Sequence, residues 1–427
     1  MLHLLVRISK IFIWFLLFIS FQAKAQWVHD LKLLQYDSDT LPLIRLDFDY
    51  AISSNAITNK FISAYAGNDF IDKDLKDDVF DRLKSRNRIG SELNTGIAYR
   101  SKTYHSKTKT DAASLQWTIA LKHRVLFSSS FSDDLFGLYF YGNKKYENQN
   151  ANINHFTFNY QQFQQLQLGA VSRSVKPIAS YTSFFGLSFL NGQDYLAIQT
   201  DRGNLFTATD ATAINLDLAL TARQADTLSR KLGTMNGAGF SIDYGLRVDI
   251  NKWKLSFQFS DLGFIGWNKK TSHINVDTTY HFEGVEVQNV LDSIYIEIKS
   301  DQEFKNGITG ATEYKKFSQT LPLLFQLSAE RLVFKEKIRA YSTLGYRVNT
   351  GMNPQLLLGV DYIFTPRFYT GIIIQLGGYS NLHAGLRAGL MMNKGWMFFA
   401  GTNYVDAVLI ESNSGGIGGS VSVQKTF

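Results

Sequence analysis

The sequence contains no cysteine and only five prolines among its 427 residues. Without cysteine there is neither a disulfide framework nor the thiol that anchors a lipoprotein. The prolines stand at predicted strand starts or turns, where a missing backbone N–H costs no ladder hydrogen bond: Pro42, Pro177, Pro322, Pro354 and Pro366. After the first 26 residues, no apolar stretch is long enough for a membrane-spanning helix. Residence in a membrane would therefore require a closed β-barrel.

The excess of positive over negative charge is also small. The formal net charge is +7, and three of the basic residues, Arg7, Lys10 and Lys24, lie in the first 25 positions. This balance gives no reason to expect a nucleic-acid partner. The histidines are scattered without helical spacing, and the aspartates at 72–78 lack the glycine of a calcium loop. We therefore expect no metal and no cofactor.

Residues 1–25 have the pattern of a secretory signal peptide. Arg7 and Lys10 precede a short apolar run, and small residues two apart end at Ala25, where we expect cleavage. Residues 26–427 then form a single exported domain. Aromatic residues make up 14% of the chain, which suits a sheet that faces lipid between aromatic girdles. The expected location is the outer membrane of a Gram-negative bacterium.

Apolar and polar residues alternate over segments of roughly 9–11 residues, the length that a tilted membrane strand needs. In one such segment Leu255, Phe257 and Phe259 share a face that opposes Ser256 and Gln258. A soluble β-sandwich would alternate as well. Strand length, the signal peptide and the terminal aromatic residue favour the barrel.

The predicted fold is an all-β, transmembrane, antiparallel up-and-down barrel of about 14 strands, with 12 to 16 as the range and one or two short helical insertions. Strands are predicted near 43–51, 91–100, 114–126, 133–142, 155–173, 177–190, 194–200, 213–221, 238–250, 252–261, 321–332, 337–349, 355–364, 367–377, 381–392, 395–404 and 416–427. The alternating last strand ends at Phe427, which we interpret as an assembly signal read by the barrel assembly machinery.

Two segments interrupt the alternation. Residues 70–86 place apolar side chains at helical spacing, and this helix is either a surface loop or a plug in the lumen. Residues 262–320 are expected to form a long extracellular insertion, because the short links fall on the opposite, periplasmic side. Within it, 285–299 has a mixed helix-or-strand pattern.

Ionisable residues on the polar faces are candidates for the lumen. They are Arg45, Asp47, Asp49, Lys122, Arg247, Asp249, Arg339, Arg347, Asp361 and Arg387, with His383 beside them. They form either a structural ladder of salt bridges or a path for a ligand. Since several are arginines, carboxylate-bearing ligands are the first class to test.

Other readings of individual residues have less support. His123 and Ser128 could serve a lipase-like barrel, but no neighbouring motif marks a nucleophile, so we expect no enzyme. Four tryptophans near predicted strand ends are expected to anchor the aromatic girdles: Trp117, Trp253, Trp267 and Trp396.

One phrase of the sequence resembles a known family. It begins Gly237-x-Gly239-x-x-x-Asp243 and ends Asp261-Leu262-Gly263-Phe264-Ile265-Gly266-Trp267. This is similar to a Bacteroidota family of outer-membrane β-barrels classed as a domain of unknown function. Segments 53–61 and 320–322 resemble it too. The resemblance implies one barrel over most of the chain, loosely similar to fatty-acid-transporter-like and type IX secretion barrels. It implies no catalytic residue.

The leading hypothesis is a transporter or channel-like barrel for a small or hydrophobic solute. The alternative is a non-transporting structural or partner subunit of a cell-surface or secretion assembly. Outer-membrane lipid would surround the protein in either case. A surface or periplasmic protein is a possible partner in the second.

Overall fold

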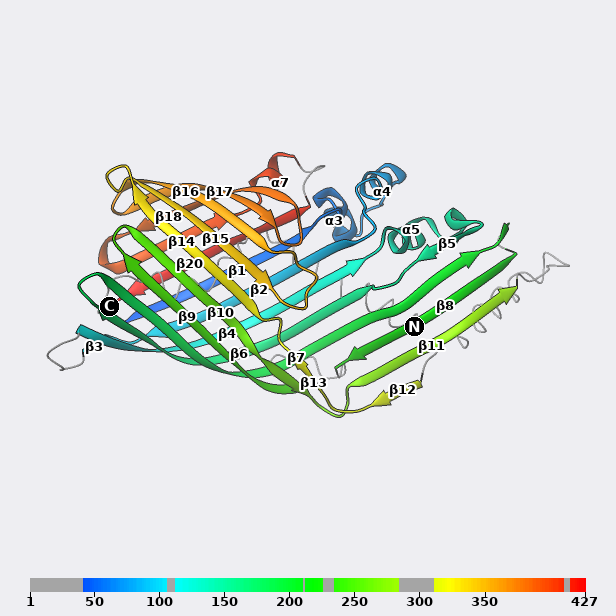
Figure 1. Cartoon of the computed structure of the whole chain (residues 1–427), viewed down its shortest axis with the longest axis horizontal. Helices are drawn as coiled ribbons and strands as arrows, with labels where there is room; N and C mark the ends of the chain where they lie inside the picture. The colour runs from blue at the N-terminus through cyan, green and yellow to red at the C-terminus, as the bar shows by residue number, and fades with distance from the viewer. Residues whose placement is uncertain (1–40, 106–111, 210–211, 226–233, 284–310, 411–414) are drawn as a thin grey trace.

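The computed structural model describes residues 41–105, 112–209, 212–225, 234–283, 311–410 and 415–427. The expected signal peptide and segment 285–299 lie outside these residues. A single antiparallel sheet forms most of the molecule (Figure 1).

Fourteen strands close this sheet into a barrel, as the alternation predicted. In order around the ring they are β1 (Leu43–Ser54), β2 (Asn87–Arg100), β4 (Ala112–Phe131), β6 (Thr157–Val175), β7 (Ala179–Thr207), β9 (Gly237–Ile250), β10 (Trp253–Trp267), β14 (Leu324–Val333), β15 (Ile338–Arg347), β16 (Gln355–Thr365), β17 (Phe368–Gly377), β18 (Leu382–Met391), β19 (Trp396–Thr402) and β20 (Gly416–Thr426). The ring closes where β20 pairs with β1 along 11 residues.

The ring has a short-turn end and a long-loop end. Hairpin turns at 176–178, 251–252, 334–337, 366–367 and 392–395 all lie at the short-turn end, with the end of β20 (Figure 1, left). The link between β2 and β4, which carries the short strand β3 (Tyr104–His105), lies at this end as well. The remaining connections, with the α-helices, lie at the opposite end. These five hairpin turns therefore lie on one side, as the predicted topology requires, although the equally short link at 378–381 lies on the other.

The two faces of the ring differ in polarity. Outward positions carry exposed apolar side chains, among them Leu46, Trp117, Leu166, Leu187, Phe240, Leu255, Leu327, Leu358, Ile372 and Leu386. Inward positions carry buried polar ones, among them Gln165, Gln167, Ser188, Asp243, Gln258 and Asp361. This is the reverse of a soluble sandwich, in which apolar residues fill the interior.

A second set of strands continues the sheet beyond the ring at the long-loop end. The last third of β7 pairs with β8 (Ala213–Gln224), β8 with β11 (Ser272–Glu283), and β11 with β12 (Ala311–Tyr314). We call these strands the distal wall (Figure 1, right). Two short strands flank it: β5 (Gln149–Asn152) pairs with β7, and β13 (Phe317–Thr320) with β10. Most of the described residues of 262–320 are thus in the sheet, and the first of them belong to β10.

The helices are α3 (Asn59–Gly67), α4 (Lys73–Phe80), α5 (Asp133–Tyr141) and α7 (Val405–Leu409), with 3₁₀ turns η2 (Asn143–Tyr146) and η5 (Asn393–Gly395). Among the described residues, no helix combines the length and hydropathy needed to span a bilayer. The prediction of a strand at 133–142 is wrong, because this segment forms helix α5. Ser132 caps it by accepting a hydrogen bond from the Leu135 N–H, and two aspartates occupy its first turn.

Helices α3, α4 and α5 pack against the outward face of the sheet, between its exposed apolar band and the long-loop end. Leu75 and Val79 of α4 join Ile52, Phe127 and Tyr160, which continue outward-facing rows of β1, β4 and β6. We call the three helices the helical collar. The Tyr141 hydroxyl donates to Asp77 at 2.6 Å and thereby lowers the pKa of that carboxyl. The helix within 70–86 therefore lies outside the ring, in a loop, rather than in the lumen.

The four predicted girdle tryptophans divide between the faces. Trp117, Trp253 and Trp396 are exposed on the outward face. Trp267 is only 2% exposed and packs inward against Tyr195 and Ile265, so its assignment to a girdle is wrong. An irregularity in β10, between Phe259 and Leu262, shifts which residues face inward beyond it.

Candidate functional site: a charged network across the lumen

All ten predicted lumen residues face inward, but they fall into separate groups. Arg45 pairs with Asp47, and Arg247 pairs with Asp249, each within one strand. Asp49 and Lys122 lie on the inward faces of β1 and β4. The remaining four belong to two larger clusters: Arg339, Asp361 and Arg387 in one, and Arg347 in the other.

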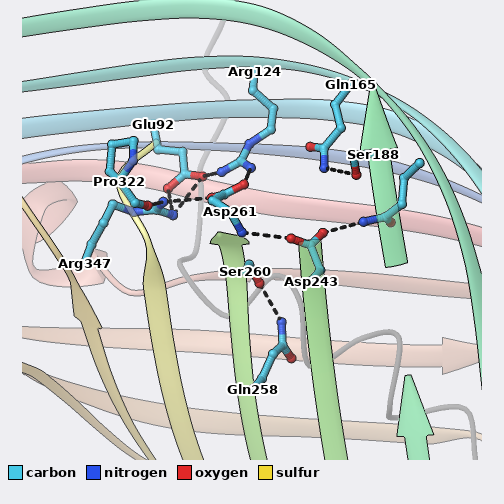
Figure 2. Close-up of polar contacts among 11 residues, drawn as sticks. Glu92, Arg124, Gln165, Ser188, Asp243, Gln258, Ser260, Asp261, Pro322 and Arg347 are labelled. Atoms are coloured by element: carbon cyan, nitrogen blue, oxygen red, sulfur yellow. Dashed lines mark hydrogen bonds and ion pairs between the residues drawn. The ribbon is translucent and has the colours of Figure 1, made fainter. Parts of the chain in front are cut away.

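Arg347 belongs to a buried network of four charges, which we call the lumen network (Figure 2). It comprises Glu92 of β2, Arg124 of β4, Asp261 of β10 and Arg347 of β15. Each arginine bonds both carboxylates. The Glu92 carboxylate lies 2.9 Å from Arg124 Nη2 and 3.0 Å from Arg347 Nη2. Asp261 lies 3.1 Å from Arg347 Nη1 and also pairs with Arg124.

The lumen network joins opposite walls of the barrel. Between β2 and β15, six strands intervene in one direction (β4, β6, β7, β9, β10, β14) and six in the other (β1, β20, β19, β18, β17, β16). The two strands are therefore diametrically opposed, yet Glu92 and Arg347 are in contact. Side chains therefore meet across the bore at this level.

The four side chains are at most 10% exposed. A charge removed from water so completely is tolerated only when it is paired and hydrogen-bonded. Two guanidinium groups and two carboxylates make the network neutral overall. Arg347 Nη1 also donates to the carbonyl of Pro322 at 2.9 Å, and the guanidinium of Arg124 lies over the ring of Phe163, 5.5 Å from its centroid.

The family-like phrase builds this site. Asp261 has the left-handed backbone angle φ = 67° at the irregularity in β10, and its N–H donates to Asp243 Oδ1 at 2.8 Å. The second oxygen of Asp243 accepts a hydrogen bond from Gln167. Asp243, in the first part of the phrase, thus holds the backbone of Asp261, in its second part. In the rest of the phrase, Leu262 and Phe264 are exposed outward, whereas Ile265 and Trp267 are buried inward.

Segment 320–322, which also resembles the family, lies against this phrase. The Leu321 N–H donates to the Gly263 carbonyl at 2.9 Å, and Pro322 supplies the carbonyl that Arg347 binds. Gly263 also lies close to the neighbouring strand β9, which is possible because it has no Cβ. A Cβ there would stand 2.0 Å from the Phe240 carbonyl oxygen of the neighbouring strand.

Loops fold inward above the lumen network, toward the long-loop end. Tyr379 is 2% exposed, and its ring occupies the space above Gly90 of β2, where a Cβ would stand 2.1 Å from the ring. Arg88 donates to the Gly378 carbonyl at 3.1 Å. Between these loops and Arg347 lies a cavity of about 30 Å³, which has room for water but not for a larger solute.

The second cluster lies toward the short-turn end. Asp361, fully buried, accepts hydrogen bonds from Arg339 at 2.6 Å and from Arg387 at 2.6 and 2.7 Å. The Arg387 guanidinium stacks over the ring of Tyr341 at 3.7 Å, and Arg339 over that of Tyr369 at 4.5 Å. Two cations facing one anion leave this cluster with a formal charge of +1.

His123 and Ser128 do not form a catalytic pair. His123 shares its face of β4 with the exposed Leu121, whereas Ser128 shares the opposite face with Arg124. Successive residues of a strand point to opposite faces, so these two side chains cannot meet across it.

Sequence reasoning missed two residues of the lumen network, Glu92 and Arg124, and named Asp243 and Asp261 only in the family-like phrase. Arg124 follows Lys122 on the same face, and Asp243 opposes Ile242 and Tyr244 in a predicted strand. Their alternation was therefore visible. Nothing in the sequence indicated that Glu92 would meet residues of β10 and β15.

The model of a family of unknown function, DUF5723, matches residues 40–403. No curated protein matches the chain. Among solved structures, the toluene transporter TodX of Pseudomonas putida aligns at a TM-score of 0.42 and 7% identity, over 95% of this chain and 94% of that one. A FadL homologue of Pseudomonas aeruginosa aligns at 0.39 and 9%, over 91% and 90%. The NalP translocator domain of Neisseria meningitidis aligns at 0.31 and 11%, over 93% and 91%. At these scores the alignments bear on neither substrate nor mechanism.

Proposed function

The chain belongs to the family of unknown function DUF5723, whose model matches most of its length. We propose that this protein is an outer-membrane channel for a small or hydrophobic solute, and that the lumen network closes the channel. The contact between Glu92 and Arg347, which stand on opposite walls, is the observation that carries the proposal. Opening requires these walls to part. No catalytic step is involved.

The polarity of the two faces supports the proposed residence in an outer membrane. Apolar side chains cover the outward face, with tryptophans at Trp117, Trp253 and Trp396. Such a surface is stable in lipid and unstable in water. The predicted signal peptide, cleaved after Ala25, would direct the chain to a Gram-negative outer membrane.

A gate explains the lumen network better than a structural ladder does. A ladder needs only neighbouring strands, as in Arg339 and Asp361 on β15 and β16. Linking β2 to β15 instead draws opposite walls together. Because the network is neutral and buried, the closed state is stable, while loss of one partner leaves a buried charge unpaired at a cost of about 3–5 kcal/mol.

The second cluster suggests the class of solute to test first. Arg339, Arg387 and Asp361 carry a net positive charge, and the rings of Tyr341 and Tyr369 lie beside the guanidinium groups. A small organic carboxylate with an apolar body would find a cation and an aromatic wall at this level. Neutral solutes of the same size form the comparison set.

Conductance in planar bilayers tests the gate. Glu92→Gln removes one carboxylate and leaves two arginines facing Asp261, so the closed state should weaken and open events should become more frequent. The matched control is Asp249→Asn, which removes a lumen carboxylate whose partner, Arg247, is on the same strand. The double variant Glu92→Gln/Arg124→Gln removes one charge of each sign, keeps the Arg347–Asp261 pair and should return conductance toward the native level. If folded Glu92→Gln conducts like the native protein, the gate does not exist.

A second candidate function, a partner subunit of a surface assembly, is favoured by one feature. The distal wall and the helical collar extend past the ring, and large apolar side chains are exposed there: Tyr139 of α5 at 60% and Phe70, in the link between α3 and α4, at 89%. Protein extracted gently from native membrane would carry a bound subunit in that case. The variant Phe70→Ser should then release it, while Phe334→Ser, at the short-turn end, should not.

A further inference from the structure

A groove of about 400 Å³ runs along the outward face of the barrel across β9, β10, β14, β15 and β16. Its floor is formed by small residues, Ala329 of β14 and Ser342 of β15, which are direct partners across the two strands. Its sides are larger apolar residues: Leu246, Val248, Leu255, Phe257, Leu327, Leu344 and Leu356. The groove therefore has the polarity of a hydrocarbon chain.

One end of the groove is cationic. Arg331 follows Ala329 on the same face of β14 and is exposed, and its guanidinium lies 5.0 Å from the ring of Trp253, its direct partner on β10. Among the described residues, Arg331 makes no ion pair. A tryptophan stacked with a cation is typical of the level where hydrocarbon meets water.

Basic residues surround that end. Exposed lysines or arginines occupy each short turn, and Glu336 is the acidic residue of the hairpin turns that the structure describes. They are Lys102, Lys176, Lys252, Lys335, Lys337, Arg367 and Lys394. Because Trp253 pairs with Arg331, the turns bearing Lys252, Lys335 and Lys337 are the ones next to the groove. The short-turn rim thus has positive charge where the groove ends.

We propose that this groove binds one anionic phospholipid, with an acyl chain between Leu255 and Leu344 and the phosphate at Arg331. The proposal rests on the outer-membrane residence proposed above. An acyl chain in the groove covers apolar surface above the small residues Ala329 and Ser342, and the phosphate supplies the anion that Arg331 lacks. Basic side chains near a bilayer surface favour anionic headgroups, each by about a fivefold change in affinity.

Native mass spectrometry on the full-length protein tests the proposal. The protein is loaded from a mixture of phosphatidylglycerol and phosphatidylethanolamine in equal amounts, and the lipids retained are counted. The native protein should keep phosphatidylglycerol preferentially. Arg331→Gln should reduce that preference about fivefold. Ala329→Phe fills the floor of the groove and should reduce retention of both lipids.

Matched controls lie on the other side of the ring. Lys425→Gln removes a cation stacked against Trp396 at the same rim, and Ala400→Phe enlarges an exposed outward alanine of β19. Neither should change the bound lipid. Equal retention of the two lipids by the native protein, or equal effects of groove and control variants, would overturn the proposal. A protein that does not insert into lipid vesicles would instead overturn the proposed membrane residence, so the two failures are distinct.

Discussion

The carboxylate of Asp243 accepts a hydrogen bond of 2.8 Å from the backbone N–H of Asp261 on the neighbouring strand. This N–H lies where β10 departs from regular pairing and therefore has no ladder partner in β9. Asp243 supplies the missing acceptor, and the side chain of Asp261 is left to bond Arg124 and Arg347. A local backbone irregularity is in this way converted into a link across the lumen.

Replacing Asp243 by alanine should weaken that link. The buried Asp261 N–H would lose its acceptor, and an unsatisfied buried donor costs about 1–3 kcal/mol. We expect the free energy of unfolding in lipid vesicles, measured by urea titration, to fall by this amount. Asp243→Asn keeps an acceptor oxygen and should fall by less. Equal stability of the alanine variant and the native protein would mean that the hydrogen bond does not hold the bulge.

Two glycines of the family-like phrase should be sensitive to alanine. A Cβ on Gly239 would stand 1.9 Å from the Phe264 carbonyl oxygen, and one on Gly263 would stand 2.0 Å from that of Phe240. Both strands would have to separate, so Gly239→Ala and Gly263→Ala should lower the heat-modifiable, folded fraction on electrophoresis. Gly266→Ala is the matched control, because its Cβ would meet nothing nearer than 3.6 Å. If all three variants fold alike, close backbone approach is not the reason for these glycines.

Much of the ring could be predicted from sequence because lipid imposes a strict alternation on it. Strands β14 to β20 match the predicted segments to within a few residues, since every second side chain there faces lipid. The alternation fails where lipid does not decide the pattern. Segment 133–142 is short and apolar, and a strand was therefore predicted there. Its apolar residues instead pack within the helical collar, and the capping Ser132 favours a helix.

The lumen network could not be predicted in the same way. Inward orientation follows from alternation, which is why Arg347 was a candidate. Its partners depend on which strands oppose each other, and that requires the strand order of the whole ring. Around Glu92 the alternation is also weak, because the outward side of β2 is covered there by the helical collar and includes Ser91. Trp267 was misplaced because the bulge at Asp261 reverses the face after it.

The helical collar should be separable from the barrel. The Phe136 ring lies 4.4 Å from that of Phe140 and 5.7 Å from that of Phe61, and it is buried. Phe136→Ala should destabilise the collar by about 3–5 kcal/mol, the usual cost of a deleted core ring. Limited proteolysis should then cut within 55–86 while the barrel stays heat-modifiable. Tyr139→Ala, on the same helix but exposed, is the control. Loss of the barrel along with the collar would show that the two fold as one unit.

Deletion of Phe427 tests the predicted assembly signal. Its N–H donates to the Pro42 carbonyl at 3.1 Å, where β20 meets β1, and its ring is 61% exposed on the outward face, 5.5 Å from the Lys425 ammonium. The single backbone hydrogen bond contributes little to a ring closed by 11 residue pairs, so the deleted protein should refold from urea nearly as well as the native one. In cells, by contrast, we expect the folded fraction in the outer membrane to fall, because the assembly machinery would no longer recognise the terminal aromatic residue. Phe427→Tyr keeps an aromatic end and should assemble normally. Unchanged assembly after the deletion would reject the signal role, and a matching loss in refolding would assign Phe427 to stability instead.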